Sequence, residues 1–309
     1  MTVNGSISPA DMGKTLIHEH VLVDFIGANE ISEDRWDKTE VIRVVLPYLK
    51  KIKMLGCNTF IECTPNYLGR DPLLLKALSD SSGLQILTNT GYYGARNNKF
   101  LPPHAFSETA DQLAARWINE WEAGINGTGI KPGFIKIGVD RGHLSEMHQK
   151  LVTAAAKTHL KTGLTIAAHT GKAIAAFEEV EILKKEGVAP EAFVWVHAQA
   201  EKDYANHVKA AKQGVWISLD GLNDKNCEKY MQMLKNLKTN GLLSKALISH
   251  DAGWYNPGQE NGGKFKPYTS LFNILLPLLK KEDFSEDEIH QLLVDNPQRA
   301  FAISIRKIE

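Results

Sequence analysis

The chain has 309 residues, with 36 basic and 36 acidic side chains and a formal net charge of zero. This balance argues against a general nucleic-acid binder or a protein of anionic membranes, because both need an excess of Lys and Arg on one face. Three cysteines, Cys57, Cys63 and Cys227, form no CxxC pair, so neither a disulfide framework nor a thiolate zinc site is expected.

The first residues of the chain, 1–14, lack the basic and then apolar pattern of a signal peptide. No apolar run along the chain reaches the length that spans a bilayer. We therefore expect a cytoplasmic protein.

Eight short apolar runs alternate with longer amphipathic stretches. The runs, which we predict to be strands, are Thr15–Val23, Cys57–Cys63, Leu84–Thr90, Gly133–Val139, Leu164–His169, Phe193–His197, Val215–Leu219 and Lys245–Ser249. Helical patterns lie between them at Lys38–Leu55, Pro72–Ser81, Ala105–Ala123, Ser145–Thr162, Lys172–Glu186, Asp203–Gln213 and Asp224–Asn240. Strands that alternate with helices indicate βαβ units and a parallel sheet.

Two architectures fit this alternation, an open doubly wound sheet and a closed barrel. No GxGxxG motif follows the first strand, which disfavours a dinucleotide-binding open sheet. Eight units with polar residues at many strand ends favour an α/β fold of the (β/α)₈ TIM barrel type. No linker divides residues 1–309, so we predict one domain, with Ala252–Pro267 as a substrate loop after the last strand.

Histidines and an aspartate stand where several of the predicted strands end. His18 and His20 share one face of the first strand, because side chains two apart on a strand point the same way. His169, His197 and Asp251 follow the fifth, sixth and eighth apolar runs. Each alone is more often a structural residue, but together at one barrel mouth they indicate a divalent metal site.

Lys136 lies between Ile135 and Ile137 in the fourth strand, where a buried ammonium is costly unless it is paired or neutralised. Three interpretations stay open from the residues alone. The amine is carboxylated by CO₂ to a carbamate that bridges two metals, it snorkels or pairs with a carboxylate, or it forms a Schiff base as in a lyase.

These residues, in this order, resemble the phosphotriesterase family of the amidohydrolase superfamily. The resemblance covers essentially the whole chain, and it rests on Thr15-Leu16-Ile17-His18-Glu19-His20, Gly69-Arg70-Asp71, Thr90-Gly91-Tyr92, Phe134-Ile135-Lys136, His169-Thr170, His197, Ser218-Leu219-Asp220, Ser249-His250-Asp251 and Asp295-Asn296-Pro297.

The resemblance implies a role for each metal-ligating position. His18, His20 and Asp251 would hold the more buried metal, and His169 and His197 the more exposed one. Carboxylated Lys136 and a hydroxide would bridge the pair. Asp251 would also be the catalytic proton acceptor, as a group in contact with both metal and hydroxide. We expect two divalent ions, zinc first, with cobalt, manganese or iron as alternatives.

The sequence departs from the organophosphate-degrading members at two positions. Those enzymes have a histidine directly after the Leu-Asp of strand seven and an aspartate three residues after the strand-six histidine, which together relay protons. Gly221 and Ala200 occupy these positions here. We therefore expect hydrolysis of lactones or carboxylic esters, including sugar or phosphorylated lactones, with phosphotriester or amide hydrolysis as the alternative.

Basic and aromatic residues after the strands are candidates for substrate binding. Tyr92 and Tyr93 follow strand three and could orient a lactone oxygen. Arg70, Arg141, Lys264 and Lys266 could attract an anionic substrate, although any one of them is more often solvated surface charge. The expected partner is a small-molecule ester or lactone, and apolar surface helices are compatible with a homodimer.

Overall fold

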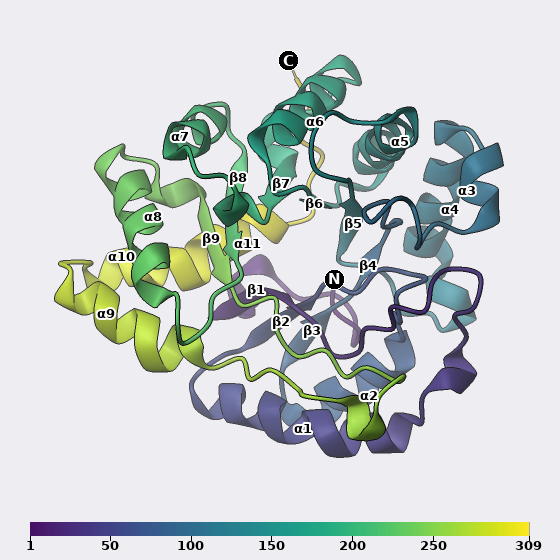
Figure 1. Ribbon diagram of the computed structural model, residues 1–309, viewed down its shortest axis with the longest axis horizontal. Helices are drawn as coiled ribbons and strands as arrows, with labels where there is room; N and C mark the ends of the chain where they lie inside the picture. The colour runs from purple at the N-terminus through teal and green to yellow at the C-terminus, as the bar shows by residue number, and fades with distance from the viewer. Residues whose placement is uncertain (309) are drawn as a thin grey trace.

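Parallel strands form the centre of the molecule, and helices surround them on all sides (Figure 1). The computed structural model describes residues 1–308. The strands are β1 Thr15–Glu19, β2 Thr59–Glu62, β3 Gln85–Leu87, β4 Asn89–Thr90, β5 Phe134–Gly138, β6 Ile166–His169, β7 Phe193–Val196, β8 Trp216–Asp220 and β9 Ala246–Ser249. They are the wall of a (β/α)₈ barrel.

The strands follow chain order around this wall. All pairs are parallel, in the orders β1-β2-β3 and β4-β5-β6-β7-β8-β9. The third predicted strand is present as two segments, β3 and β4, interrupted at Thr88, so nine labelled segments fill eight positions. The barrel closes where the amide of Asp251 donates to the carbonyl of His18 (3.0 Å) and the amide of His20 donates to that of Ala252 (2.9 Å).

The helices form the outer layer. They are α1 Lys38–Met54, α2 Pro72–Ser82, α3 Pro103–Ser107, α4 Ala110–Ala123, α5 Glu146–Thr162, α6 Ala173–Lys185, α7 Tyr204–Lys212, α8 Cys227–Thr239, α9 Leu276–Lys281, α10 Glu286–His290 and α11 Asn296–Phe301, with π-helical turns at Leu271–Leu275 and Gln291–Asp295. None of the helices in residues 1–308 has the length and apolar character needed to cross a membrane.

Local sequence signals set several helix starts. Six helices begin at a side chain that accepts a hydrogen bond from a backbone amide of the first turn, which satisfies a donor that the helix itself leaves free. These residues are Asp37, Asp71, Thr109, Ser145, Asp203 and Ser285. The single predicted helix Ala105–Ala123 is two helices, because Thr109 forms a capping box with Gln112 and starts α4 anew.

The side chains of the strands alternate between two apolar layers. One face packs against the helices, as Phe60, Ile135, Trp195 and Ile217 do. The other face fills the barrel, with Ile17, Ile61, Leu87, Phe134, Ala167, Val194, Trp216 and Leu247, and Phe301 of α11 covers Phe134 at a ring distance of 5.6 Å. This packing closes the interior at the amino ends of the strands and leaves their carboxyl ends free for a site.

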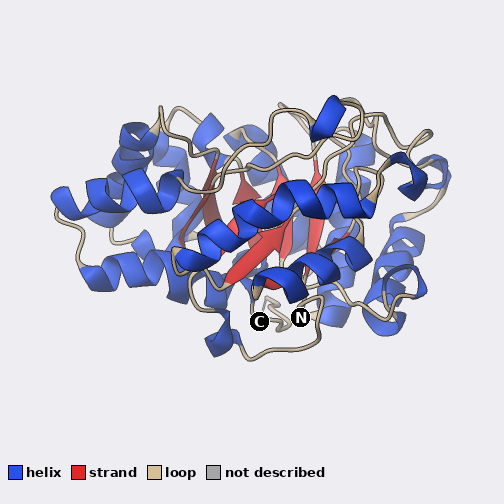
Figure 2. Ribbon diagram, turned by 90° about the horizontal axis from the view of Figure 1, so that it is seen from below, coloured by secondary structure: helices blue, strands red, loops and turns tan. Residues whose placement is uncertain are grey.

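Both ends of the described chain lie at the amino ends of the strands. The amide of Val3 donates to the carbonyl of Ile86 (2.8 Å), and the hydroxyl of Thr165, just before β6, donates to the carbonyl of Ala300 (2.5 Å). In the side view of Figure 2, N and C lie close together below the strands.

Candidate metal centre and active site

The six residues predicted to ligate metal line a single pocket of about 430 Å³. Each comes from the carboxyl end of a strand or from the residues directly after it. They are His18 in β1 and His20 after it, Lys136 in β5, His169 at the end of β6, His197 after β7 and Asp251 after β9. Side chains far apart in sequence therefore meet at the barrel mouth, as the apolar runs predicted.

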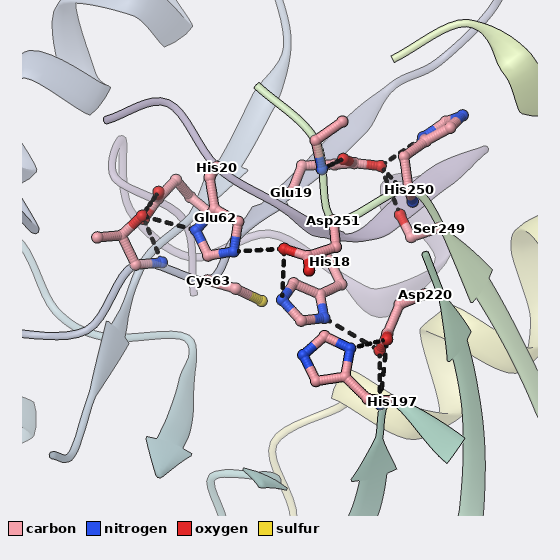
Figure 3. Close-up of polar contacts among 12 residues, drawn as sticks. His18, Glu19, His20, Glu62, Cys63, His197, Asp220, Ser249, His250 and Asp251 are labelled. Atoms are coloured by element: carbon pink, nitrogen blue, oxygen red, sulfur yellow. Dashed lines mark hydrogen bonds and ion pairs between the residues drawn. The ribbon is translucent and has the colours of Figure 1, made fainter. Parts of the chain in front are cut away.

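Asp251 lies among the histidines (Figure 3). Its Oδ1 atom is 3.0 Å from Nε2 of His20 and 3.7 Å from Nε2 of His18. The rings of His18 and His197 are 5.1 Å apart, and those of His197 and His169 are 4.3 Å apart. One donor atom from each of His18, His197 and Asp251 lies within 4.8 Å of the other two, a separation at which a single ion could join them.

A second aspartate, Asp220 at the end of β8, fixes two of the imidazoles. One carboxylate oxygen is 3.0 Å from Nδ1 of His18, and the other is 2.5 Å from Nδ1 of His197. The backbone amide of His197 also donates to Asp220 (3.0 Å). Because both Nδ1 atoms face this carboxylate, both Nε2 atoms are left for a ligand, which is how carboxylates orient metal-binding histidines. Asp220 belongs to a matched segment, but no role was predicted for it.

His20 is oriented by a different pair of side chains. Its Nδ1 atom is 2.8 Å from the hydroxyl of Thr64, and that hydroxyl lies 2.5 Å from the buried carboxylate of Glu62. Glu62 also accepts hydrogen bonds from the amides of Val21 and Thr64. The ring of His20 is thus held with Nε2 toward Asp251.

Lys136 is only 2% exposed, and within residues 1–308 its Nζ atom has no hydrogen-bond partner. No carboxylate pairs with it in this part of the chain, so the ion-pair interpretation is not supported. A buried amine without a partner is costly. Conversion to a carbamate that ligates metal would remove this cost, so the residue fits a site for two cations.

Burial keeps two of the imidazoles, those of His18 and His169, in the form that binds metal. Burial and the nearby Lys136 ammonium lower the pKa of His18 to about 4, and burial lowers the pKa of His169 well below its ordinary value. Burial also opposes protonation of His197, but the adjacent Asp220 carboxylate outweighs it and raises the pKa. Asp251 is buried too, yet its histidine neighbours lower its pKa. A neutral imidazole and an ionised carboxylate are the states that ligate a cation.

Two of the candidate metal ligands have a strained backbone. His197 has a φ of 61° and Asp251 a φ of 52°, both in the left-handed region that costs a non-glycine residue about 1 kcal/mol. Gly253 follows at a φ of 94°, where a Cβ atom would lie 1.9 Å from the carbonyl oxygen of His20. The chain after β9 is therefore folded tightly against β1, and this places Asp251 beside both histidines of that strand.

Glu19 points away from the pocket, on the opposite side of β1 from His18 and His20. Its Oε1 atom accepts hydrogen bonds from the hydroxyl of Ser249 (2.7 Å) and the amide of His250 (3.0 Å), and Oε2 accepts from the amide of Ala252 (3.0 Å). This fully buried carboxylate fastens the segment around Asp251 to the first strand.

Only some of the residues predicted to bind substrate line the pocket. Tyr93 and Arg141 line the pocket, and the ring of Tyr93 is 5.0 Å from that of His169. Tyr92 points elsewhere: it is 5% exposed, and its hydroxyl is 2.9 Å from Nε2 of His104. The expected role of Tyr92 in orienting a lactone oxygen is therefore corrected to packing.

Three basic residues lie outside the pocket and require correction. Arg70 is buried, with its guanidinium 2.6 Å from a carboxylate oxygen of Glu120, so it stabilises the interior and does not face substrate. Lys264 and Lys266 are exposed in the last loop and do not line the pocket that the described residues form. Lys266 reaches it only indirectly, with Nζ 3.5 Å from the ring centroid of Trp254.

The structure adds pocket residues that the sequence did not single out individually, although Trp254 lies in the predicted substrate loop Ala252–Pro267. Arg96 and Asp140 line the pocket, together with apolar and aromatic side chains that include Val23, Phe25, Leu68 and Trp254. These residues sit in loops of irregular backbone, where no periodic pattern marks the orientation of a side chain.

A barrel with this donor set at its strand ends is a metal-dependent hydrolase that acts on ester bonds. A sequence profile of the phosphotriesterase family matches residues 1–301. The chain is 28% identical to the phosphotriesterase homology protein of Escherichia coli over 293 residues, 94% of this chain and 98% of that protein. It is also 28% identical to the aryldialkylphosphatase of Saccharolobus solfataricus over 313 residues, 96% of this chain and 97% of that enzyme.

The fold agrees with a solved structure of similar sequence. A mutant of a PTE-like lactonase from Deinococcus radiodurans superposes with a TM-score of 0.87 at 26% identity, over 98% of this chain and 99% of that one. The chain belongs to the phosphotriesterase family.

Proposed function

We propose that this protein hydrolyses lactones or carboxylic esters with two divalent metal ions, with zinc as the first expectation. His18, His20 and Asp251 would hold one ion, and His169 and His197 the other. Carboxylated Lys136 would bridge them. The buried Lys136 amine without a partner, together with the imidazole and carboxylate donors around it, supports this assignment.

When bound, such a pair of cations lowers the pKa of water and polarises a carbonyl oxygen. The side chains then have separate tasks. The Oδ atoms of Asp251, ionised because histidines surround them, can accept a proton from water and return it to the leaving oxygen. Tyr93 lies beside His169 and can position the ester oxygen. Val23, Phe25 and Leu68 exclude water from the carbon skeleton.

We propose esters rather than phosphotriesters as substrates because the proton relay of the organophosphate-degrading enzymes is missing here. Gly221 and Ala200 have no side chain that could hold or pass a proton. The space beside Gly221 is already filled, since a Cβ atom there would lie 2.7 Å from the hydroxyl of Tyr230 and 2.8 Å from Nε2 of Gln199. Gln199 in turn bonds to Asp220, with its Nε2 3.3 Å from Oδ1. An ester or lactone needs only the proton that Asp251 can carry.

A substrate screen of metal-loaded protein tests the proposal. Lactones, aryl esters, N-acyl amides and a paraoxon-type triester are compared by kcat/KM, with metal content measured by elemental analysis. We expect the lactones or esters to exceed the triester by about two orders of magnitude or more, corresponding to roughly 3 kcal/mol in transition-state stabilisation. A triester or amide as the best substrate would refute the assignment.

A further inference from the structure

We propose that the natural substrate carries a negatively charged group, a carboxylate or a phosphate, and that Arg96 and Arg141 bind this group at the pocket mouth. The inference rests on the proposed function, because it takes the reacting carbonyl to lie at the histidines of the same pocket. Both arginines line that pocket, and neither belongs to the metal-ligating set.

The loop that carries Arg96 is held in an uncommon conformation. Arg96, Asn97 and Asn98 have φ values of 61°, 56° and 61°, three consecutive residues in the left-handed region. Such a run is unfavourable for residues other than glycine unless the surroundings hold it. Here the carboxylate of Asp140 accepts hydrogen bonds from the amides of Arg96 (2.6 Å) and Asn97 (3.0 Å).

Asp140 therefore sets the position of one arginine and directly precedes the other. It lies in the chain just after β5 and just before Arg141, so one carboxylate links the two loops that carry the guanidinium groups. Its oxygens are used by backbone amides. Its ion-pair contact is with His148 (3.8 Å), and within residues 1–308 no ion pair joins it to the guanidinium of Arg96 or Arg141.

The guanidinium of Arg96 is placed over an aromatic ring. Its Cζ atom is 4.8 Å from the centroid of Phe25, which also lines the pocket. A cation–π contact of this kind holds the guanidinium in place without using its N–H donors, which stay free to bind an anion. Phe25 is itself fixed, since its carbonyl accepts a hydrogen bond from Nζ of Lys99 (2.7 Å).

Neither pocket arginine has an acidic partner in residues 1–308, whereas three other arginines of the chain do. Arg35, Arg70 and Arg116 are ion-paired with Asp24, Glu120 and Glu108. The other carboxylate of the pocket, Asp251, faces His18 and His20. An anionic group on the substrate is thus the partner that the two guanidiniums lack, and bidentate pairing with arginine suits both carboxylate and phosphate.

The arrangement also orients the substrate. The carbonyl end must reach the histidines, the carbon skeleton contacts Phe25, Leu68 and Trp254, and the anion meets the two arginines. A lactone with a charged substituent on its ring satisfies all three requirements.

Matched pairs of lactones test the inference. Glucono-1,5-lactone 6-phosphate is compared with glucono-1,5-lactone, and 5-oxotetrahydrofuran-2-carboxylate with the neutral 5-(hydroxymethyl)oxolan-2-one, on the metal-loaded protein. We expect KM to be lower for the charged member of at least one pair by about tenfold or more, as charge-assisted hydrogen bonds predict. The pair that shows the preference distinguishes phosphate from carboxylate.

Arginine variants assign the preference to the two side chains. In Arg96→Gln and in Arg141→Gln, the ratio of KM for the neutral lactone to KM for the charged one should fall by about tenfold toward one. Arg43→Gln removes the same charge from an exposed position on α1 and should keep the wild-type ratio. A ratio near one in the wild type, or a ratio that both pocket variants retain, would overturn the inference while leaving lactone hydrolysis intact.

A binding measurement separates the anion site from the reaction. 1,5-Anhydroglucitol 6-phosphate and tetrahydrofuran-2-carboxylate lack the ester bond, and calorimetry gives their Kd for the wild type and for Arg96→Gln. Weaker binding to the variant by about tenfold supports the anion site even if no lactone is turned over. Equal Kd values would mean that the anion binds at the metals or not at all, and the arginine site would be wrong.

Discussion

At the residue scale, the unpaired amine of Lys136 leads to a prediction about the number of metal ions that the protein binds. Lys136→Met keeps the length and apolar stem of the side chain but removes the only group able to form a bridging carbamate. We expect fewer than two metal ions per chain and a loss of hydrolytic activity of about a hundredfold or more, because the bridge contributes to both metal sites. The metal-free variant should be as stable as the metal-free wild type, since a costly buried amine is gone. Two tightly bound ions in Lys136→Met, measured by elemental analysis after dialysis, would contradict the bridging role.

A second prediction at this scale concerns Asp220, which contacts two candidate metal ligands but is not itself a candidate ligand. Asp220→Asn keeps the shape but loses the charge that fixes the Nδ1 atoms of His18 and His197. We expect metal affinity to fall by about tenfold to a hundredfold. Competition with a metal-binding dye measures this change. Asp80→Asn, at an exposed position on α2, is the control and should leave affinity at the wild-type value.

The meeting of the candidate metal ligands in one pocket could be predicted from the sequence for a physical reason. A strand that enters a barrel core must be apolar, so a His or Asp where the run stops marks the barrel mouth, and His169, His197 and Asp251 all follow this pattern. The same reasoning, that a polar residue after a strand lies at the barrel mouth, fails for Arg70. It follows a strand, but its partner Glu120 lies on α4, and sequence separation hides the ion pair that buries it. Arg96 was missed because its loop has no periodicity.

At the element scale, the junction of β4 and β5 depends on a glycine. Gly91 has a φ of 109°, and a Cβ atom there would lie 2.3 Å from the carbonyl oxygen of Lys136. We expect Gly91→Ala to lower the free energy of unfolding by about 3 kcal/mol or more and to displace the strand that carries Lys136. Gly127→Ala is the matched control. Its φ of 72° is also positive, but nothing lies within 4 Å of the added atom, so only about 1 kcal/mol should be lost. Urea unfolding of the two variants measures the difference, and equal losses would rule out the close contact as the cause.

Helix α6 contains a buried acid that makes stability depend on pH. Burial raises the pKa of Glu179 to about 8, and Thr170 provides its one hydrogen bond, to Oε2 at 2.6 Å. An acid whose pKa is raised on folding binds its proton more tightly in the folded state. Its stabilising contribution is therefore complete below its ordinary pKa and is lost as the pH rises through about 8.

Glu179→Gln removes this titration and resembles the protonated form. We expect its free energy of unfolding, relative to the wild type, to increase by on the order of 3 kcal/mol between pH 5 and pH 8. Glu181→Gln on the same helix is exposed and should show no such trend. Unfolding curves of the metal-free proteins across this range make the comparison, and parallel curves for wild type and Glu179→Gln would show that the acid is ionised in the fold.

The elements themselves were predictable to different degrees. The eight strand positions follow from apolar runs that only a buried parallel sheet explains, and the boundaries moved inward where a run continued into a loop, as after Glu19 in β1. The helices α9, α10 and α11 were not predicted. They are only five or six residues long. One π-helical turn precedes α9 and another joins α10 to α11, so the helical period is interrupted before it can be recognised.

At the scale of the whole molecule, metal binding at the proposed site would join the two edges at which the barrel closes. His18 and His20 belong to the first strand and Asp251 to the segment after the last, and the carbonyl of His18 accepts the amide of Asp251. Cations that bind only the folded state stabilise it by about 2.7 kcal/mol at a hundredfold excess over Kd. Chelation should therefore abolish activity and lower the Tm by several degrees, and added zinc should restore both. An unchanged Tm with full loss of activity would mean that the ions do not hold the closure together.

The position of the two ends of the described chain has a practical consequence for engineering. Val3 and Ala300 are bonded to the amino-terminal side of the barrel, and the pocket opens at the opposite side. An affinity tag or a fused protein at either end would extend away from the entrance for substrate. Immobilisation through such a tag should therefore leave the pocket of each bound molecule open to the solution. A short peptide could also connect the ends and allow new ones to be cut elsewhere on that side, giving a circular permutant with an undisturbed reaction centre.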